Sequence, residues 1–298
     1  MRLVFSVFLC FCAGFLITVI LPVISAGKPA GKLLVLGACG LVCLATALFL
    51  IRKRWTEGNS ARRVVLALVC AYAGMLLGFW SHHLAGPGAG AGKTTFSTVQ
   101  MLVALGSFQG ALLLFVPGFL REHELGPAEA FGLTNRLGFA LACGALAASL
   151  FLPFSFMLQH ATAWLMENLP RVALHPEEQS AVHTIRSASS WFDRLTLGGA
   201  TIILAPLSEE VLFRGIIYPW IKNFGFPQLA LWGTSLIFAI VHFNLLSLPA
   251  LFLLALMLTL LYEKTGNLLA PIAAHSLFNA FNLLALYQLE HRIQQSPY

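Results

Sequence analysis

Long apolar runs recur along the whole chain, and short polar segments separate them. Most of the runs are long enough to cross a bilayer as helices, because a membrane-spanning helix needs about 20 apolar residues. Strands of a membrane barrel would be about ten residues long and would alternate in polarity. The pattern predicts an all-α fold, a polytopic transmembrane helix bundle with about eight or nine spans, the eighth being short. The candidate spans are 3–24, 33–51, 64–85, 99–120, 137–158, 197–221, 229–247, 248–263 and 268–287.

The composition agrees with a membrane protein. Of the 298 residues, 58% are hydrophobic and 10% are charged, and the mean hydropathy of +0.81 excludes a water-soluble domain. The net charge of +6 does not indicate a nucleic-acid partner, because the basic residues lie beside the apolar runs. Arg2 and the basic loop 52–63 flank the first two spans. Since basic residues collect in cytoplasmic loops, we expect a multi-pass protein of the cell membrane with a cytoplasmic N-terminus, no nucleic-acid partner, and the lipid bilayer around it.

The polar segments divide the chain into four parts. Residues 1–136 hold four spans without charge in their apolar centres and are expected to form an N-terminal transmembrane scaffold. Residues 137–194 hold the fifth span and a polar connector, which we expect to lie at the membrane surface as one or two short helices. Residues 195–287 form a transmembrane core that contains the polar cluster described next. Residues 288–298 are a short C-terminal tail.

The sixth span, TIILAPLSEEVLFRGIIYPWI, places Glu209, Glu210 and Arg214 inside an apolar run. Each ionised side chain at the centre of a membrane helix costs about 2.5 to 3.5 kcal/mol, so the three together would cost roughly 8 to 10 kcal/mol if unpaired. Residues four apart share a helix face, so Glu210 and Arg214 are expected to form an ion pair. Glu209 lies about 140° from Arg214 around the helix and needs a partner from another helix.

Candidate partners for Glu209 lie in two later spans. His242 lies in FAIVHF of the seventh span, and His275 and Asn279 share one face of the ninth. A single histidine in an apolar helix is usually a satisfied core residue, but polar residues on three neighbouring spans favour a common site. Counted along ideal helices, His242 lies roughly 20 Å from the cytoplasmic start of its span and His275 only about 11 Å. Tilt, helix ends that differ from the predicted ones, or a broken eighth helix must absorb this difference. Pro206, one turn before Glu209, is expected to introduce a kink.

These residue types suit the attack of water on a carbonyl group. A carboxylate in a partly dry site can act as a general base, which suits Glu209, and His242 can share the water's proton. His275 and Asn279 can present two donors to a developing oxyanion from one helix face. The alternative is a metal site, because Glu209, His242 and His275 are also the ligand set of a His₂Glu zinc centre. No HExxH motif occurs, so the residues leave both possibilities open.

Three motifs, EEVLFR at 209–214, FAIVH at 238–242 and HSLFN at 275–279, together resemble the CPBP family of intramembrane proteases. This family is also called the Abi or CAAX-protease family, and it includes the type II CAAX-prenyl endopeptidases. The resemblance covers about residues 195–287, and the preceding spans carry no recognisable match.

The resemblance implies an intramembrane endopeptidase that cuts a membrane-associated protein or peptide. The family has been described both as metalloproteases and as metal-free glutamate proteases; the unequal depths of the two histidines favour the metal-free form, with zinc as the alternative. Two other classes also suit a polar membrane cluster: an ion- or proton-coupled transporter, and a catalytically silent scaffold. The residues that the resemblance assigns are Glu209 as base, His242 sharing the water, His275 and Asn279 holding the oxyanion, and Glu210 and Arg214 in support.

Overall fold

The computed structural model describes residues 124–134, 136–168, 190–242 and 244–295, with single positions between 109 and 188 and with side chains up to residue 288. The chain divides into two compact units, Met1–Glu124 and Leu125–Tyr298, and the elements below belong to the second. The first three predicted spans, most of the fourth and the N-terminus, which is expected in the cytoplasm, lie outside the described residues.

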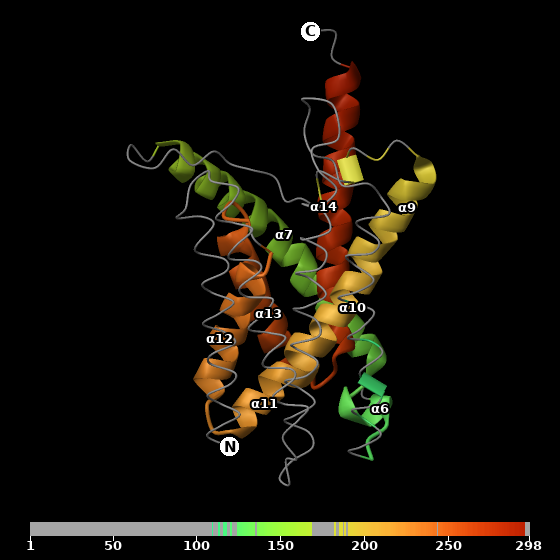
Figure 1. The fold of residues 1–298 in the computed structure, drawn as a ribbon, viewed down its shortest axis with the longest axis vertical. Helices are drawn as coiled ribbons and strands as arrows, with labels where there is room; N and C mark the ends of the chain where they lie inside the picture. Colours follow the sequence, from blue (N-terminus) through green and yellow to red (C-terminus); the bar gives the residue numbers. More distant parts are fainter. Residues whose placement is uncertain are drawn as a thin grey trace, which may run out of the picture. The chain divides into compact units, whose positions relative to one another are not determined.

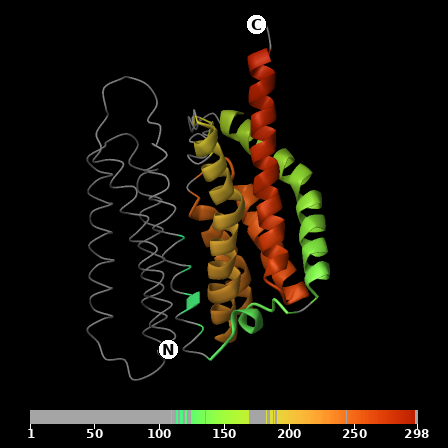
Figure 2. The ribbon, with the colours of Figure 1, turned by 90° about the vertical axis from the view of Figure 1, so that its right-hand side faces the viewer.

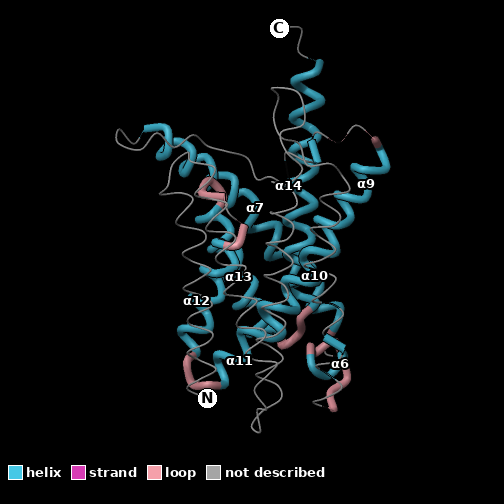
Figure 3. Tube along the Cα trace, in the orientation of Figure 1, coloured by secondary structure: helices cyan, strands magenta, loops and turns pink. Residues whose placement is uncertain are grey.

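The described part of the chain is helical throughout and contains no strand (Figure 3). α7, α13 and the Leu269–Gln288 part of α14 are each long and apolar enough to cross a membrane. The prediction of an all-helical membrane protein is therefore confirmed, whereas the total of eight or nine spans stays a prediction. The elements are α6 (Pro127–Ala130), α7 (Leu137–Asn168), α9 (Trp191–Gly199), η2 (Ala200–Leu204), α10 (Ala205–Glu210), η3 (Val211–Ile217), α11 (Tyr218–Asn223), α12 (Pro227–Ile240), α13 (Leu248–Thr265) and α14 (Leu269–Gln295).

The boundary between the seventh and eighth spans differs from the expectation. α12 ends at Ile240, and His242 lies in the turn that follows it, not inside a helix. The backbone N–H and the hydroxyl of Ser247 both donate to Asn244 Oδ1, at 2.9 and 2.8 Å. An asparagine that bonds to nearby backbone offers the chain a turn in place of the helical ladder. The eighth span is a full-length helix of 18 residues.

The fifth span extends beyond its predicted end at residue 158, and most of the expected surface connector lies outside the described residues. α7 continues to Asn168, and α9 already begins at Trp191. The polar side chains at the end of α7 bond to carbonyls of their own helix, from Thr162 Oγ1 to Leu158 at 2.8 Å and from Asn168 Nδ2 to Trp164 at 2.7 Å. Because these groups are satisfied locally, they do not end the helix. At the other side, Ser190 caps α9 by accepting the N–H of Phe192.

The helices of this unit form one bundle in which α7 packs along α14 and α12 along α13 (Figure 1). Contacts join several turns at one end of the bundle. The N–H of Leu268, between α13 and α14, donates to the Phe131 carbonyl after α6 at 3.0 Å. Lys222 of α11 and Glu263 of α13 form an exposed ion pair at 2.6 Å. The chain therefore returns to the same end after α11 and again after α13.

Gly144 lies where α7 meets α14, and we expect its replacement to destabilise the bundle. A Cβ atom at Gly144 would lie 2.5 Å from the Ala270 carbonyl oxygen and 3.2 Å from the Ala274 nitrogen. Because these are backbone atoms, the helices would have to separate. Gly144→Ala is expected to lower the free energy of unfolding by about 1–3 kcal/mol, measured by unfolding in detergent.

The matched control for this prediction is Gly138→Ala on the same helix. A Cβ atom at Gly138 meets nothing within 4 Å, so alanine there keeps or raises stability by up to roughly 1 kcal/mol through its better helix propensity. Equal stability changes for the two variants would contradict the close approach of α7 and α14 at Gly144.

Candidate active site

The two glutamates lie on a short α-helix between two π-helical segments. η2 precedes α10 and η3 follows it, so the path from Trp191 to Asn223 is helical throughout but changes its winding twice. Each π segment ends two residues before a proline, at Leu204 before Pro206 and at Ile217 before Pro219. Proline has no N–H and its ring crowds the carbonyl four residues earlier, so a wider turn accommodates it. At Pro206 the structure thus shows a π segment where a kink was expected.

Glu210 and Arg214 form the predicted ion pair, and both side chains are buried. Arg214 Nη1 lies 2.7 Å from Glu210 Oε1. The remaining guanidinium donors reach α13, where Nη2 donates to the Ala255 carbonyl at 2.8 Å and Nε to Thr259 Oγ1 at 3.3 Å. The guanidinium carbon also lies 4.9 Å from the centre of the Phe238 ring. Buried charges are stable only when paired and hydrogen-bonded, and these contacts supply that condition.

Thr259 is a member of this network that the sequence did not reveal. Its hydroxyl accepts from Arg214 Nε and donates to the Ala255 carbonyl at 2.9 Å. The signal was weak, because a single threonine in the apolar run LALMLTLLY resembles any helix residue that bonds back to its own turn. Only the bonds that Arg214 of η3 makes to Ala255 and Thr259 of α13 distinguish it.

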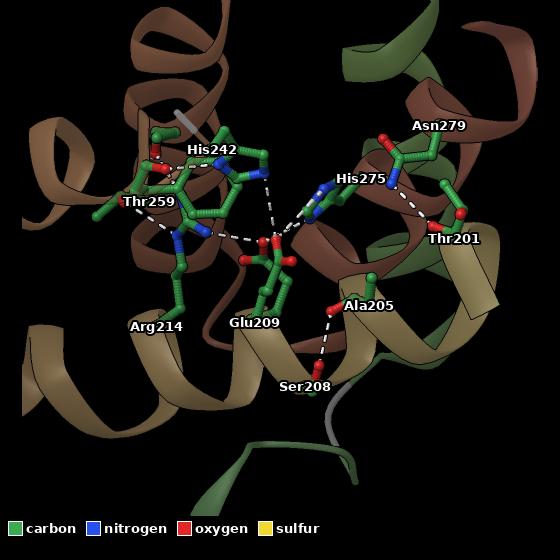
Figure 4. A network of polar contacts seen from close by, with 12 residues as sticks. Thr201, Ala205, Ser208, Glu209, Arg214, His242, Thr259, His275 and Asn279 are labelled. Carbon is green, nitrogen blue, oxygen red and sulfur yellow. Dashed lines mark hydrogen bonds and ion pairs between the residues drawn. The ribbon is translucent and has the colours of Figure 1, made fainter. Parts of the chain in front are cut away.

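Glu209 lies between the two predicted histidines (Figure 4). Its Oε2 atom is 4.0 Å from His242 Nε2 and 3.9 Å from His275 Nε2. The side chain of Glu209 is 15% exposed, that of His242 is 22% and that of His275 is 3%, so the site is mostly dry but accessible from the side of His242. With Glu210, these three residues form what we call the carboxylate–imidazole cluster.

Hydrogen bonds fix which nitrogen of each histidine carries a proton. His242 Nδ1 lies 2.7 Å from the Phe238 carbonyl, which can only accept, so Nδ1 donates and Nε2 presents a lone pair. His275 Nδ1 lies 3.0 Å from Glu210 Oε1. With Glu210 ionised beside Arg214, this Nδ1 donates as well, and its Nε2 also presents a lone pair. Three acceptor atoms therefore face one another: Glu209 Oε2 and the two Nε2 atoms.

Such a convergence of acceptors suits a shared donor. Glu209 Oε2 is buried, and no residue in the described part of the chain donates a hydrogen bond to it. Buried acceptors are normally satisfied by a hydrogen bond, and a water molecule can supply two donors at once. The geometry of the cluster therefore fits a bound water that Glu209 and one imidazole polarise together.

A zinc ion is the other group that three lone pairs can hold, with each imidazole fixed at Nδ1 as in known zinc sites. Tetrahedral zinc with bonds of about 2.0–2.1 Å would bring its ligand atoms to roughly 3.3 Å from one another. The separations of 3.9 and 4.0 Å are wider. Among the described residues, no group of three or more His, Cys, Asp and Glu side chains has the spacing of a metal site. The residues thus fit water more closely than zinc.

Asn279 has one hydrogen-bond donor engaged outside the carboxylate–imidazole cluster. Its Nδ2 atom donates to the backbone carbonyl of Thr201 in η2 at 2.9 Å, so one of its two amide hydrogens already has a partner. It lies one turn after His275 on α14, as the spacing predicted. The structure thus brings Glu209, Glu210, His242 and His275 together, and it directs Asn279 toward η2.

The expected difference in depth between the two histidines has a structural explanation. α12 and α14 do not begin at the same level, and Figure 2 shows α14 beginning above the lower end of the helix that contains α11. His242 also lies beyond the last turn of α12, whereas His275 lies in the second turn of α14. Because α12 and α14 begin at different levels, both imidazoles reach the same carboxylate.

The helices define an integral membrane protein with a buried carboxylate–imidazole cluster. Residues 191–281 match the family model described as type II CAAX prenyl endopeptidase Rce1-like. This segment contains every predicted site residue, and the match confirms the resemblance inferred from the three motifs.

Several curated proteins are similar to part of this chain. The chain is 40% identical over 82 residues to "Uncharacterized protein YpbD" of Bacillus subtilis, which is 26% of this chain and 39% of that protein. It is 36% identical over 98 residues to "UPF0177 protein YxdF" of Lactococcus lactis, covering 32% and 53% of the two chains. It is 35% identical over 91 residues to "Putative membrane peptidase YdiL" of Bacillus subtilis, covering 30% and 35%. The chain thus spans about half or less of these relatives, and no solved structure matches it.

Proposed function

We propose that the protein is an intramembrane endopeptidase that hydrolyses a peptide bond of a membrane-associated protein or peptide. The observation that carries this proposal is the position of Glu209 Oε2, which faces the lone pairs of His242 and His275 at 4.0 and 3.9 Å. The match of residues 191–281 to the Rce1-like family supports the same class of reaction. The name of one relative, a membrane peptidase, agrees with it.

In the proposed reaction, Glu209 accepts a proton from the bound water while His242 Nε2 accepts the second hydrogen bond. The hydroxide formed attacks the carbonyl carbon of the substrate and gives a tetrahedral oxyanion. The proton held by Glu209 then passes to the leaving nitrogen as the C–N bond breaks. The products are one carboxylic acid and one amine, so the atoms balance.

The oxyanion is proposed to accept hydrogen bonds from His275 and Asn279. His275 already donates from Nδ1 to Glu210, so its Nε2 donates only after the ring takes up one proton from solvent before the attack, and the ring returns this proton to solvent when the products leave. Asn279 can offer its second amide hydrogen only, since the first is bonded to Thr201. Glu210 and Arg214 support the site by holding His275 in this orientation.

We propose that the protein lies in the cell membrane with its N-terminus in the cytoplasm. Three basic residues, Arg136, Lys222 and Lys264, lie near the turns that meet at one end of the bundle. Basic residues favour the cytoplasmic side, which assigns this end to the cytoplasm. With the four predicted spans before residue 121, this assignment is consistent with the inside start expected from Arg2 and the loop 52–63.

The proposed function is tested with purified protein in proteoliposomes and a peptide anchored in the same bilayer by an apolar segment. We expect a single new cleavage site near the membrane, identified by mass spectrometry of the products, and no cleavage of the same peptide without its anchor. Proton or ion flux through the proteoliposomes with the anchored peptide left intact would instead favour a transporter and overturn the proposal.

Metal dependence is a separate prediction. We propose the metal-free form, in which Glu209 and His242 activate water directly, because the acceptor atoms lie wider apart than ligands of one zinc ion. Active protein is expected to contain far less than one zinc per chain by elemental analysis and to keep its cleavage rate in a strong chelator. Stoichiometric zinc that is removed together with activity, and restores it when added back, would establish the His₂Glu site instead.

A further inference from the structure

The carbonyl of Thr201 loses both of its regular helical partners. In an α-helix it would accept the N–H of Ala205, but in η2 this N–H donates to the Ala200 carbonyl. In a continued π-helix it would accept the next N–H along the chain, and that residue is Pro206, which has none. The change of winding before a proline therefore frees one carbonyl in the middle of an apolar helix.

Asn279 supplies the missing donor from another helix. Its Nδ2 atom lies 2.9 Å from the Thr201 oxygen although the two residues are 78 positions apart in the sequence. A free carbonyl in the apolar interior is costly, and neighbouring helices commonly satisfy carbonyls that a proline releases. The bond thus links α14 to the π segment that leads directly into α10 (Figure 4).

We propose that Asn279, besides offering its second amide hydrogen to the oxyanion, acts as a positioning residue, whose bond to the Thr201 carbonyl fixes α10 against α14 and so sets the separation of Glu209 and His275. The two helices carry these groups close to the bond. Glu209 is the fifth residue of α10, which begins directly after η2, and His275 lies one turn before Asn279. This inference rests on the proposed function for its catalytic consequence, but the bond itself does not depend on it.

Pro206 makes the proposal testable, because alanine at this position restores an N–H that can reach Thr201. If Asn279 acts through Thr201, Asn279→Ala lowers kcat and the midpoint of thermal unfolding, and adding Pro206→Ala recovers part of both. We expect recovery by about five- to tenfold in kcat, the factor by which one hydrogen bond shifts an equilibrium. Pro206→Ala alone is expected to cleave within a few-fold of the unaltered protein.

Two matched controls separate this effect from general changes in helix stability. Pro219 follows η3 as Pro206 follows η2, so Pro219→Ala restores an N–H at the other π segment and is expected to give Asn279→Ala no recovery. Asn282 lies on α14 near Asn279, but its Nδ2 donates to the Phe278 carbonyl of its own helix at 2.9 Å. Asn282→Ala is expected to keep kcat unchanged.

The result that supports the proposal is recovery of both kcat and the unfolding midpoint by Pro206→Ala and not by Pro219→Ala. Recovery of the midpoint alone would mean that Asn279 acts on the reaction only through the oxyanion and would overturn the positioning role. If Pro206→Ala recovers neither kcat nor the unfolding midpoint, the bond to the Thr201 carbonyl is not the reason for the effect of Asn279→Ala, and the proposal is overturned. If the unaltered protein cleaves no anchored peptide, the proposed function fails, while the unfolding midpoints still decide whether Asn279 and Pro206 act on the same carbonyl.

Discussion

Glu209→Gln is expected to abolish peptide cleavage while the protein remains folded. Glutamine has almost the same shape but cannot accept a proton, so the proposed general base is lost. Loss of a general base costs about 10²–10⁴-fold in kcat. The amide of glutamine can donate to the Nε2 atoms of His242 and His275, which already face this position, so the fold of the cluster is retained. Cleavage of the anchored peptide and the unfolding midpoint are measured together.

Glu263→Gln is the matched control for this variant. Glu263 is an exposed carboxylate in the ion pair with Lys222, at the end of the bundle and away from the cluster. We expect Glu263→Gln to cleave at the rate of the unaltered protein. If Glu209→Gln keeps more than a tenth of the activity, Glu209 does not act as the base, and the proposed mechanism is wrong even where peptidase activity is real.

Arg214→Met is expected to have the largest effect on stability. The guanidinium is 1% exposed and is the cation that neutralises Glu210, which is fully buried. Removing one partner of a buried ion pair leaves an uncompensated charge and costs about 3–5 kcal/mol. Methionine fills a similar volume, so the loss of charge dominates over the loss of packing. The free energy of unfolding in detergent micelles measures this cost.

A second substitution tests the physical reason. Glu210→Gln added to Arg214→Met removes the buried charge and is expected to recover a large part of the lost stability, since ion pairs that are replaced as a whole are often tolerated. Lys222→Met removes a cation from an exposed pair and is expected to cost at most about 1 kcal/mol. If the double variant is no more stable than Arg214→Met, the cost lies in the contacts with Ala255 and Thr259 and not in the charge of Glu210.

Both variants concern one chain of contacts that runs through three helices. A carbonyl of α13 accepts a hydrogen bond from Arg214, and Arg214 forms an ion pair with Glu210. Glu210 in turn accepts a hydrogen bond from Nδ1 of His275. The free Nε2 of His275 then faces Glu209. The two neighbouring glutamates therefore differ in their surroundings: Glu210 Oε1 is bonded to Arg214 and His275, whereas Glu209 Oε2 faces only acceptors. The proposed chemistry depends on that difference.

Part of the site followed directly from the sequence. The ion pair of Glu210 and Arg214 was predicted because residues four apart lie on one helix face, and the need of Glu209 for partners from other helices followed from the same geometry. The breaks in winding were harder to place. Pro206 indicated an irregularity, but the sequence predicted a kink where the structure has a π segment, and it extended the seventh helix beyond His242, where Asn244 forms a turn.

The sequence by itself determined the helical membrane character and the local pairing of charges, because hydropathy and the helical repeat act over neighbouring residues. Only the tertiary structure decided that both Nε2 atoms face Glu209, that Thr259 supports Arg214 and that Asn279 bonds to Thr201. These contacts join residues on different helices. They depend on where each helix begins, how it winds and how deeply it packs, and no local pattern of residues specifies these distances.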